Sequence, residues 1–140
     1  MITVSDYFKA YKGHPEITPE FEANAETLLK SVNELLDECK LLGWSPQINP
    51  YTGTYISGQD NGGWRPQNCP IGASKSSHKQ ARGVDIADGD GSLDEVITDA
   101  LLKKYGLFRE APEATAGWCH LTDRPPGSWT QSTVKRTFWP

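Results

Sequence analysis

The sequence lacks any long apolar run, and this absence excludes a membrane-spanning helix. No stretch of its 140 residues approaches the roughly 20 consecutive apolar residues that such a helix requires. The opening residues, MITVSDYFKAYKGH, also lack the cationic and then apolar segments of a secretory signal peptide. We therefore expect neither membrane insertion nor export through such a signal.

Cysteine is also scarce. Cys39, Cys69 and Cys119 include no CxxC pair, so neither a thiolate zinc site nor a dithiol redox centre is indicated. Three reduced thiols are the simplest interpretation. The formal net charge is −4, and the lysines and arginines are scattered along the chain. This distribution argues against a nucleic-acid-binding surface.

Hydrophobic residues make up 36% of the chain and charged residues 23%, a composition typical of globular proteins. The length suits one domain, 1–140, with a real core. The clearest predicted element is a helix that begins at Thr18-Pro19 and ends at Gly43. Its apolar residues alternate at intervals of four and three: Phe21, Ala25, Leu28, Val32, Leu35, Cys39 and Leu42. Packing of this helix on a sheet is preferred to a coiled-coil partner.

The remaining elements predicted are shorter. Residues 44–75 are rich in Gly, Pro, Asn and aromatics, and an irregular segment this long is usually a functional loop. A second helix is predicted from Ser92, which forms a capping box with Glu95. We expect strands at 54–57, 84–87 and 117–121, this helix at 92–105 and an extended tail at 134–139. The mixture predicts an α+β fold with a small antiparallel sheet flanked by helices.

Four acidic residues follow the second strand and raise the question of a calcium loop. The EF-hand spacing fails, because it would place Ile86 and Ile97 at positions that need side-chain oxygens. A turn that leads into a capped helix explains the acids better. They are Asp88, Asp90, Asp94 and Glu95.

A histidine and an aspartate seven residues apart, His78 and Asp85, are the strongest chemical feature. Zinc accepts imidazole nitrogen and carboxylate oxygen, and a catalytic site offers three protein ligands and one open position. The chain contains three histidines. His14 precedes a proline in a predicted exposed turn, so His120, on a predicted strand, is the economical third ligand. From spacing alone, a metal site and a polar loop that runs into a strand both remain open.

The residues around this pair resemble the zinc site of a known superfamily. SSHKQARGVDI and the later GWCHL look like the SxHxxGxAxD and WxH motifs of D-Ala-D-Ala carboxypeptidases and L-alanyl-D-glutamate endopeptidases. YISGQDNGGWRP resembles the strand and SGWRP segment of that superfamily, with an insertion between the halves. HLTDRPPGS, ITVSDYF and TPEFEANAETLLKSVNELL resemble a subgroup from phage and prophage genomes, so the likeness covers nearly the whole chain.

The resemblance implies a role for each matching position. It implies that His78, Asp85 and His120 bind Zn²⁺ and that Ser76 hydrogen-bonds near the metal or a substrate carboxylate. It implies that Arg65 stabilises the carbonyl oxygen or carboxylate of the substrate, a task that suits a guanidinium group. Trp118 is expected on the same side of its strand as His120, where it either walls the site or packs in the core.

Two departures from the superfamily pattern stand out. The glycine and alanine positions after the histidine are occupied by Ala81 and Gly83, a swap of small residues. Active members place a Glu or Asp, as general base, three residues before the second zinc histidine, and that position is Gly117. Glu110 and Glu113 lie in the preceding loop, and Glu110 is the better candidate for the missing acid/base.

The resemblance implies a fold like that of the hedgehog and D-Ala-D-Ala peptidase proteins and a zinc-dependent peptidase that cleaves peptidoglycan stem peptides. A phage or prophage protein of this kind would be made in the host cytoplasm and would act at the cell wall or within a virion. One alternative is a zinc-binding virion module that has lost catalysis, which Gly117 favours. A weaker alternative is a domain without metal in which the His-Asp pair only ties a loop.

Overall fold

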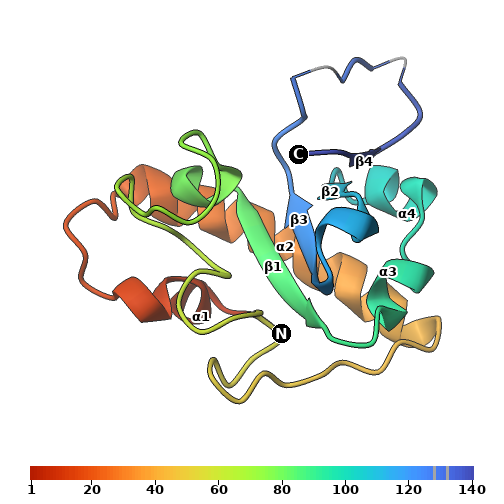
Figure 1. Cartoon of the computed structure of the whole chain (residues 1–140), viewed down its shortest axis with the longest axis horizontal. Helices are drawn as coiled ribbons and strands as arrows, with labels where there is room; N and C mark the ends of the chain where they lie inside the picture. Colours follow the sequence, from red (N-terminus) through yellow and green to blue (C-terminus); the bar gives the residue numbers. More distant parts are fainter. Residues whose placement is uncertain (128, 132) are drawn as a thin grey trace.

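The computed structural model describes residues 1–127, 129–131 and 133–140, and it has an α+β architecture. A four-stranded sheet, in the order β1-β3-β2-β4, packs against a long helix, α2 (Figure 1). The helices are α1 (Val4–Phe8), α2 (Pro19–Leu41), α3 (Ser92–Val96) and α4 (Asp99–Lys104), with 3₁₀ helices η1 (Lys9–Tyr11), η2 (Ser77–Gln80) and η3 (Pro112–Ala114). The strands are β1 (Gly83–Asp88), β2 (Phe108–Glu110), β3 (Gly117–Thr122) and β4 (Thr137–Phe138).

Helix α2 confirms the prediction from the apolar spacing. The Thr18 hydroxyl accepts a hydrogen bond from the Phe21 N–H at 3.2 Å and caps the helix. Just past its C-terminal end, Gly43 has a φ of +104°, which favours glycine. Most of the predicted stripe is buried, and Leu29 and Leu36 join it. Leu42, the last apolar residue of the predicted stripe, follows the last helical turn and is 58% exposed.

The sheet contains the two predicted central strands. β1 pairs antiparallel with β3, and β3 pairs antiparallel with β2, whereas β2 and β4 are parallel. The predicted strands at 84–87 and 117–121 are therefore confirmed. The predicted tail at 134–139 forms only the two-residue β4, and β2 was not predicted. Both are too short to carry a periodic signal in the sequence.

The strand predicted at 54–57 is wrong as a continuous element. Residues there form isolated bridges, Asn49 with Thr54 and Ile56 with Ile86. The Ser57 N–H donates to the Asp85 carbonyl at 2.8 Å, so this segment does lie along β1. The irregular loop then leaves the strand before a ladder can form.

The helix predicted at 92–105 is split, and its predicted capping box does not form. Asp88 caps α3 instead, because its carboxylate accepts hydrogen bonds from the N–H groups of Leu93 and Asp94 at 2.9 and 3.0 Å. Ile97 is extended, and the Thr98 hydroxyl caps α4 through the Leu101 N–H at 3.2 Å. Asp88 caps the start of α3 and Thr98 caps the start of α4, so one periodic stretch of sequence forms two short helices.

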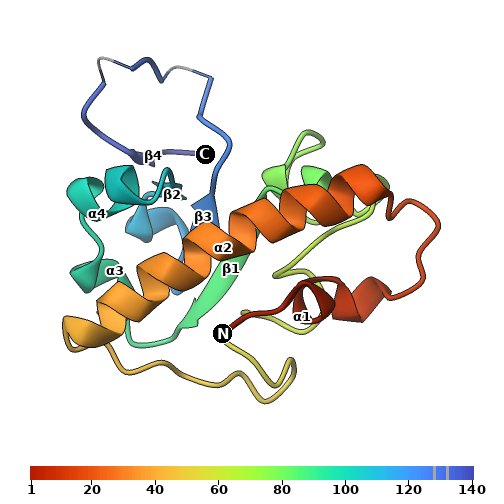
Figure 2. The same cartoon turned by 180° about the vertical axis from the view of Figure 1, so that it is seen from behind.

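The sheet has an apolar face and a polar face. Figure 2 shows α2 crossing the sheet, and the core cluster joins its leucines to Val84, Ile86 and Leu121. Side chains alternate along a strand, so Asp85 and His120 point to the opposite face. The three cysteines are free, as predicted, and all three are buried. Within the described residues, no helix combines the length and apolar character needed to cross a membrane.

Candidate metal centre

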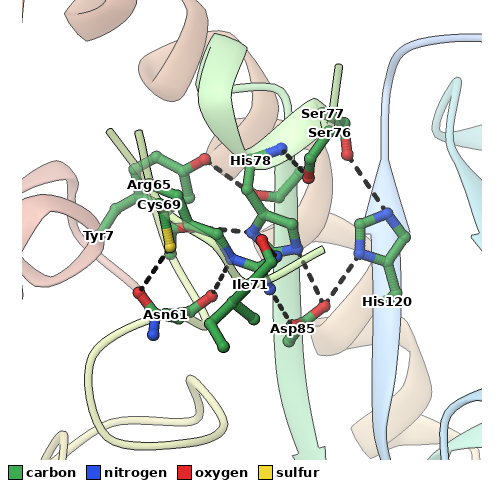
Figure 3. A network of polar contacts seen from close by, with 12 residues as sticks. Tyr7, Asn61, Arg65, Cys69, Ile71, Ser76, Ser77, His78, Asp85 and His120 are labelled. Atoms are coloured by element: carbon green, nitrogen blue, oxygen red, sulfur yellow. Dashed lines mark hydrogen bonds and ion pairs between the residues drawn. The ribbon is translucent and has the colours of Figure 1, made fainter. Parts of the chain in front are cut away.

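Three buried side chains converge on the polar face of the sheet. His78 comes from η2, Asp85 from β1 and His120 from β3, and each residue is at most 8% exposed. Each offers one ligand atom, and these atoms all lie within 4.8 Å of one another. Figure 3 shows both imidazoles pointing toward the Asp85 carboxylate. The group could hold a metal ion.

The backbone explains why these residues meet. Asp85 and His120 are direct cross-strand partners in the β1–β3 ladder. The Asp85 N–H and carbonyl bond to Gly62 and Ser57 on the other side of β1, which leaves a closely spaced pair facing β3. η2 ends at Ala81, whose left-handed φ of 57° turns the chain back toward β1. The seven-residue detour between the first two predicted ligands is therefore a 3₁₀ turn followed by a reversal.

Each of the three side chains is anchored by its second polar atom. The His78 Nδ1 atom lies 2.8 Å from the Gly63 carbonyl oxygen. A carbonyl only accepts hydrogen bonds, so Nδ1 carries a proton, and Nε2 is the ring nitrogen left to act as the metal ligand. The His120 Nε2 atom lies 3.3 Å from the Ser77 hydroxyl, and its Nδ1 atom faces Asp85. Outer partners of this kind orient metal ligands.

Asp85 is anchored by Arg65. The Arg65 Nη2 atom donates to Oδ2 at 3.3 Å, which leaves Oδ1 facing the His78 Nε2 and His120 Nδ1 atoms at 3.2 and 2.9 Å. Burial by itself raises the pKa of Asp85. The charge of His78 and the hydrogen bonds from both histidines outweigh burial, and the pKa lies well below its ordinary value. The side chain is therefore a carboxylate, the form that binds metal.

The donor set fits zinc. Two imidazole nitrogens and one carboxylate oxygen are common zinc ligands, and three protein ligands leave one position open. Ligand atoms about 2.0–2.1 Å from a tetrahedral zinc ion lie about 3.3 Å from one another. The two histidine–aspartate distances of 3.2 and 2.9 Å are close to that separation, and the three ligand atoms all lie within 4.8 Å of one another.

The three side chains line a cavity of about 740 Å³. Four further residues from the sequence prediction line the same cavity: Arg65, Ser76, Glu110 and Trp118. Glu113 is exposed and lies outside it, so Glu110 is the better placed of the two glutamates. Gly117 also lies outside this cavity, at the end of β3 opposite Asp88.

Arg65 is more constrained than its expected role at the substrate requires. Its Nε atom donates to the Asn61 carbonyl at 2.7 Å and its Nη1 atom to the Ile71 carbonyl at 3.2 Å, in addition to the ion pair with Asp85. The residue is 7% exposed. These contacts make Arg65 first of all a positioning residue for the carboxylate. Ser76 has a local role too, because its hydroxyl accepts from the His78 N–H at 3.3 Å and caps η2.

The swap of small residues at 81 and 83 has a steric explanation. Ala81 occupies a left-handed conformation in which glycine is unstrained. At Gly83, a Cβ atom would lie 2.2 Å from the Ser77 hydroxyl and 3.1 Å from the His120 Cε1 atom. Gly83 therefore makes room for the hydroxyl that orients His120. The Tyr7 hydroxyl donates to the Gly83 carbonyl at 2.7 Å, and burial raises the pKa of Tyr7, so this donor stays protonated.

Sequence reasoning missed Ser77, Gly63 and Arg124. In the run Ser76-Ser77-His78, only the 3₁₀ geometry shows which hydroxyl reaches His120. Gly63 contributes a carbonyl, which carries no sequence signal. Arg124 lies within HLTDRPPGS, but the resemblance assigned it no role, and only the structure shows that it lines the cavity from beyond the end of β3.

His14 lies away from the cluster. It packs 5.3 Å from Trp64, ring centroid to ring centroid, and its Nδ1 atom accepts from the Glu16 N–H. It is half-buried rather than exposed.

Comparisons with protein-family models, curated proteins and solved structures found no match to this chain. The site's own geometry therefore defines what can be stated: a buried His-Asp-His group able to hold a metal ion in an α+β fold.

Proposed function

We propose that this chain is a zinc-dependent peptidase that cleaves peptidoglycan stem peptides. The observation that carries the proposal is the convergence of His78, Asp85 and His120 beside a cavity that Glu110 also lines. The motif resemblance supplies the substrate class and a phage or prophage setting. The protein would then act at the cell wall or as part of a virion, with peptidoglycan peptides or virion proteins as partners.

Each residue of the site has a separate role in the proposed reaction. Zinc, when bound, supplies a Lewis acid for hydrolysis of an amide bond. Arg65 holds the carboxylate of Asp85 in its ligand orientation, and the Gly63 carbonyl and Ser77 hydroxyl do the same for the two imidazoles. Glu110 takes a proton from water and delivers it to the leaving amine, and Trp118 walls the cavity.

The number of ligands favours catalysis over a purely structural metal. Structural zinc sites are usually closed by four protein ligands, whereas catalytic sites keep one position open. Within the described residues, the group consists of three side chains and opens on a cavity. Gly117 supports the competing proposal of a zinc-binding virion module without catalysis, because the usual base is missing there. The two proposals differ in whether Glu110 acts as the general acid–base in place of the residue missing at position 117.

A second chemistry is suggested by the same contacts. The Ser77 hydroxyl, His120 and Asp85 follow one another at 3.3 and 2.9 Å, the order of a Ser-His-Asp triad. However, Ser77 is only 5% exposed, and its hydroxyl packs against Gly83. A Ser-His-Asp triad also gives His78 no role in the reaction. We therefore prefer the metal site, in which all of these contacts have a function.

The test is digestion of purified peptidoglycan by the zinc-loaded chain, with mass spectrometry of the released peptides. The proposal predicts new peptide termini that are absent with His78→Ala and absent after chelation, and that return when zinc is added back. Zinc retention without any product beyond that of His78→Ala would leave the binding module. Product that survives chelation but is blocked by a fluorophosphonate would establish the serine mechanism instead.

A further inference from the structure

The cavity beside the metal group is cationic, although the chain as a whole is acidic. The formal net charge of the protein is −4, yet three cationic side chains, Arg65, Lys75 and Arg124, line this cavity with two acidic side chains, Asp85 and Glu110, and with Pro140, the last residue of the sequence. Asp85 is paired with Arg65, so its charge is compensated. A bound divalent metal would add further positive charge. A cavity of one sign concentrates ligands of the opposite sign.

Arg124 reaches the cavity because of the strand that precedes it. Alternate residues of β3 line the cavity, namely Trp118, His120 and Thr122, and Arg124 continues this alternation just past the strand end. The turn is fixed locally, since the Arg82 Nε atom donates to the Asp123 carboxylate at 2.9 Å and the Arg124 N–H donates to the Thr122 hydroxyl at 3.0 Å. The position of Arg124 is therefore set by the same strand that carries His120.

The guanidinium of Arg124 is held in place but lacks a counter-charge. Its Nη1 atom donates to the Lys75 carbonyl and to the Gln80 side chain, both at 2.9 Å. These contacts use one of its three nitrogens and bring Lys75 beside it. Neither cation forms an ion pair within the part of the chain that the structure describes. Burial, and then the nearby charge of Arg82, lower the pKa of Arg124, which is consistent with a cation that lacks an anionic partner.

Arg65 cannot take the place of Arg124. Its guanidinium is committed to Asp85 and to two backbone carbonyls. Arg124 is half-buried, so it is both ordered and accessible. A planar guanidinium with unused N–H groups binds a carboxylate through two parallel hydrogen bonds.

We infer that Arg124, with Lys75 beside it, binds a carboxylate of the peptide substrate and so gives this site its preference for acidic peptides. The inference rests on the proposed function for its choice of substrate. The carboxylate belongs either to the C-terminus of the peptide or to an acidic residue within it. Both sources present the same chemistry to the guanidinium.

Two matched pairs of peptides distinguish these sources. The first pair is diacetyl-L-Lys-D-Ala-D-Ala as free acid and as C-terminal amide. The second is L-Ala-γ-D-Glu-L-Lys amide, with the α-carboxyl of D-glutamate either free or amidated. Binding of each peptide to the zinc-loaded chain is measured by calorimetry, for the wild type, Arg124→Gln, Arg124→Lys and Lys103→Gln. Lys103 is exposed in α4 and serves as the control for loss of one positive charge.

We expect the wild type to bind the free acid of at least one pair about tenfold more tightly than its amide, as a charge-assisted hydrogen bond allows. Arg124→Gln should abolish this preference, Arg124→Lys should retain part of it, and Lys103→Gln should leave it unchanged. The pair that discriminates identifies the source of the carboxylate. Circular dichroism confirms that each variant is folded, and Arg124→Lys keeps the test valid if Arg124→Gln does not fold.

Three results would overturn the inference: equal binding of acid and amide, a preference that persists in Arg124→Gln, or no binding of any peptide. Each of these results would overturn the inference even if the chain hydrolyses peptidoglycan. Conversely, an acid preference that depends on Arg124, without hydrolysis of any peptide, sustains the inference and removes the proposed peptidase activity. The two failures are therefore distinguishable.

Discussion

The Arg65 Nη2 atom lies 3.3 Å from Oδ2 of Asp85, and the second oxygen of the same carboxylate faces both histidines. The two side chains are only 9% and 11% exposed, so water does not replace this contact. The ion pair thus decides which oxygen of Asp85 is free to bind a metal. Its position at the centre of the cluster makes it the natural target for the first variant.

Arg65→Gln should weaken zinc affinity by about 10–100-fold, because an outer-sphere partner of a metal ligand is lost. Competition with a fluorescent zinc chelator measures this change. Arg82→Gln is the matched control, since it breaks a more exposed arginine–aspartate pair, with Asp123, outside the cluster. Equal zinc affinity in Arg65→Gln and the wild type would show that Asp85 needs no such anchor.

Ser77→Ala separates the metal mechanism from a serine mechanism. If the hydroxyl only orients His120, zinc affinity falls about tenfold and activity returns at saturating zinc. If the hydroxyl is a nucleophile, activity is lost while zinc affinity is unchanged. Ser74→Ala, in the exposed loop just before, is the control. We predict lower zinc affinity with activity restored at saturating zinc. Zinc titrations of each variant, followed by activity assays, measure this.

Glu110→Gln should lower the rate of peptide cleavage at least tenfold with zinc retained, because general acid–base catalysis contributes about 10²–10⁴-fold. The isosteric change removes the proton-transfer group and keeps the shape of the cavity. Glu113→Gln provides the matched control, since Glu113 is exposed and lies outside the cavity. A rate unchanged in Glu110→Gln removes this residue from the mechanism and strengthens the noncatalytic alternative.

Gly83→Ala should destabilise the fold by about 1–3 kcal/mol, the usual cost of an overpacked interior. The added Cβ atom would meet the Ser77 hydroxyl at 2.2 Å, so we also expect weaker zinc binding. Gly89→Ala is the control, because its nearest neighbour would be a side-chain oxygen of Gln47 at 3.5 Å. Chemical denaturation of both variants measures the difference, and equal stabilities would contradict the packing described here.

Elements with a strong local signal could be predicted from the sequence. α2 has a capping threonine, a regular apolar spacing and a terminal glycine, and all three determine its real bounds. β1 and β3 are short, largely buried strands at the centre of the sheet, with apolar residues at alternate positions. The break at Ile97 could not be predicted in the same way, because Ile97 is extended and Thr98 caps a new helix within one periodic stretch of sequence.

For the candidate site, the sequence indicated the metal ligands but not the contacts that hold them in place. The residues alone indicated His120 as the economical third ligand but left a metal site and a polar loop both open, and the motif resemblance favoured the metal site. The cross-strand register that places His120 opposite Asp85 is a tertiary property, as is the contact between Ser77 and His120. Arg124 lies beyond the strand, in the HLTDRPPGS segment to which the resemblance gave no chemical role, so only the alternation of β3 in space reveals its place in the cavity.

The central claim is that His78, Asp85 and His120 hold a zinc ion, and metal analysis of the chain purified without chelator tests it most directly. The predicted result is about one zinc per chain in the wild type and in His14→Ala, and loss of zinc in His78→Ala and His120→Ala. His14 is the matched control because it packs on Trp64, away from the cluster. A zinc content below about 0.2 per chain in the wild type, or zinc retained by both ligand variants, would contradict the account.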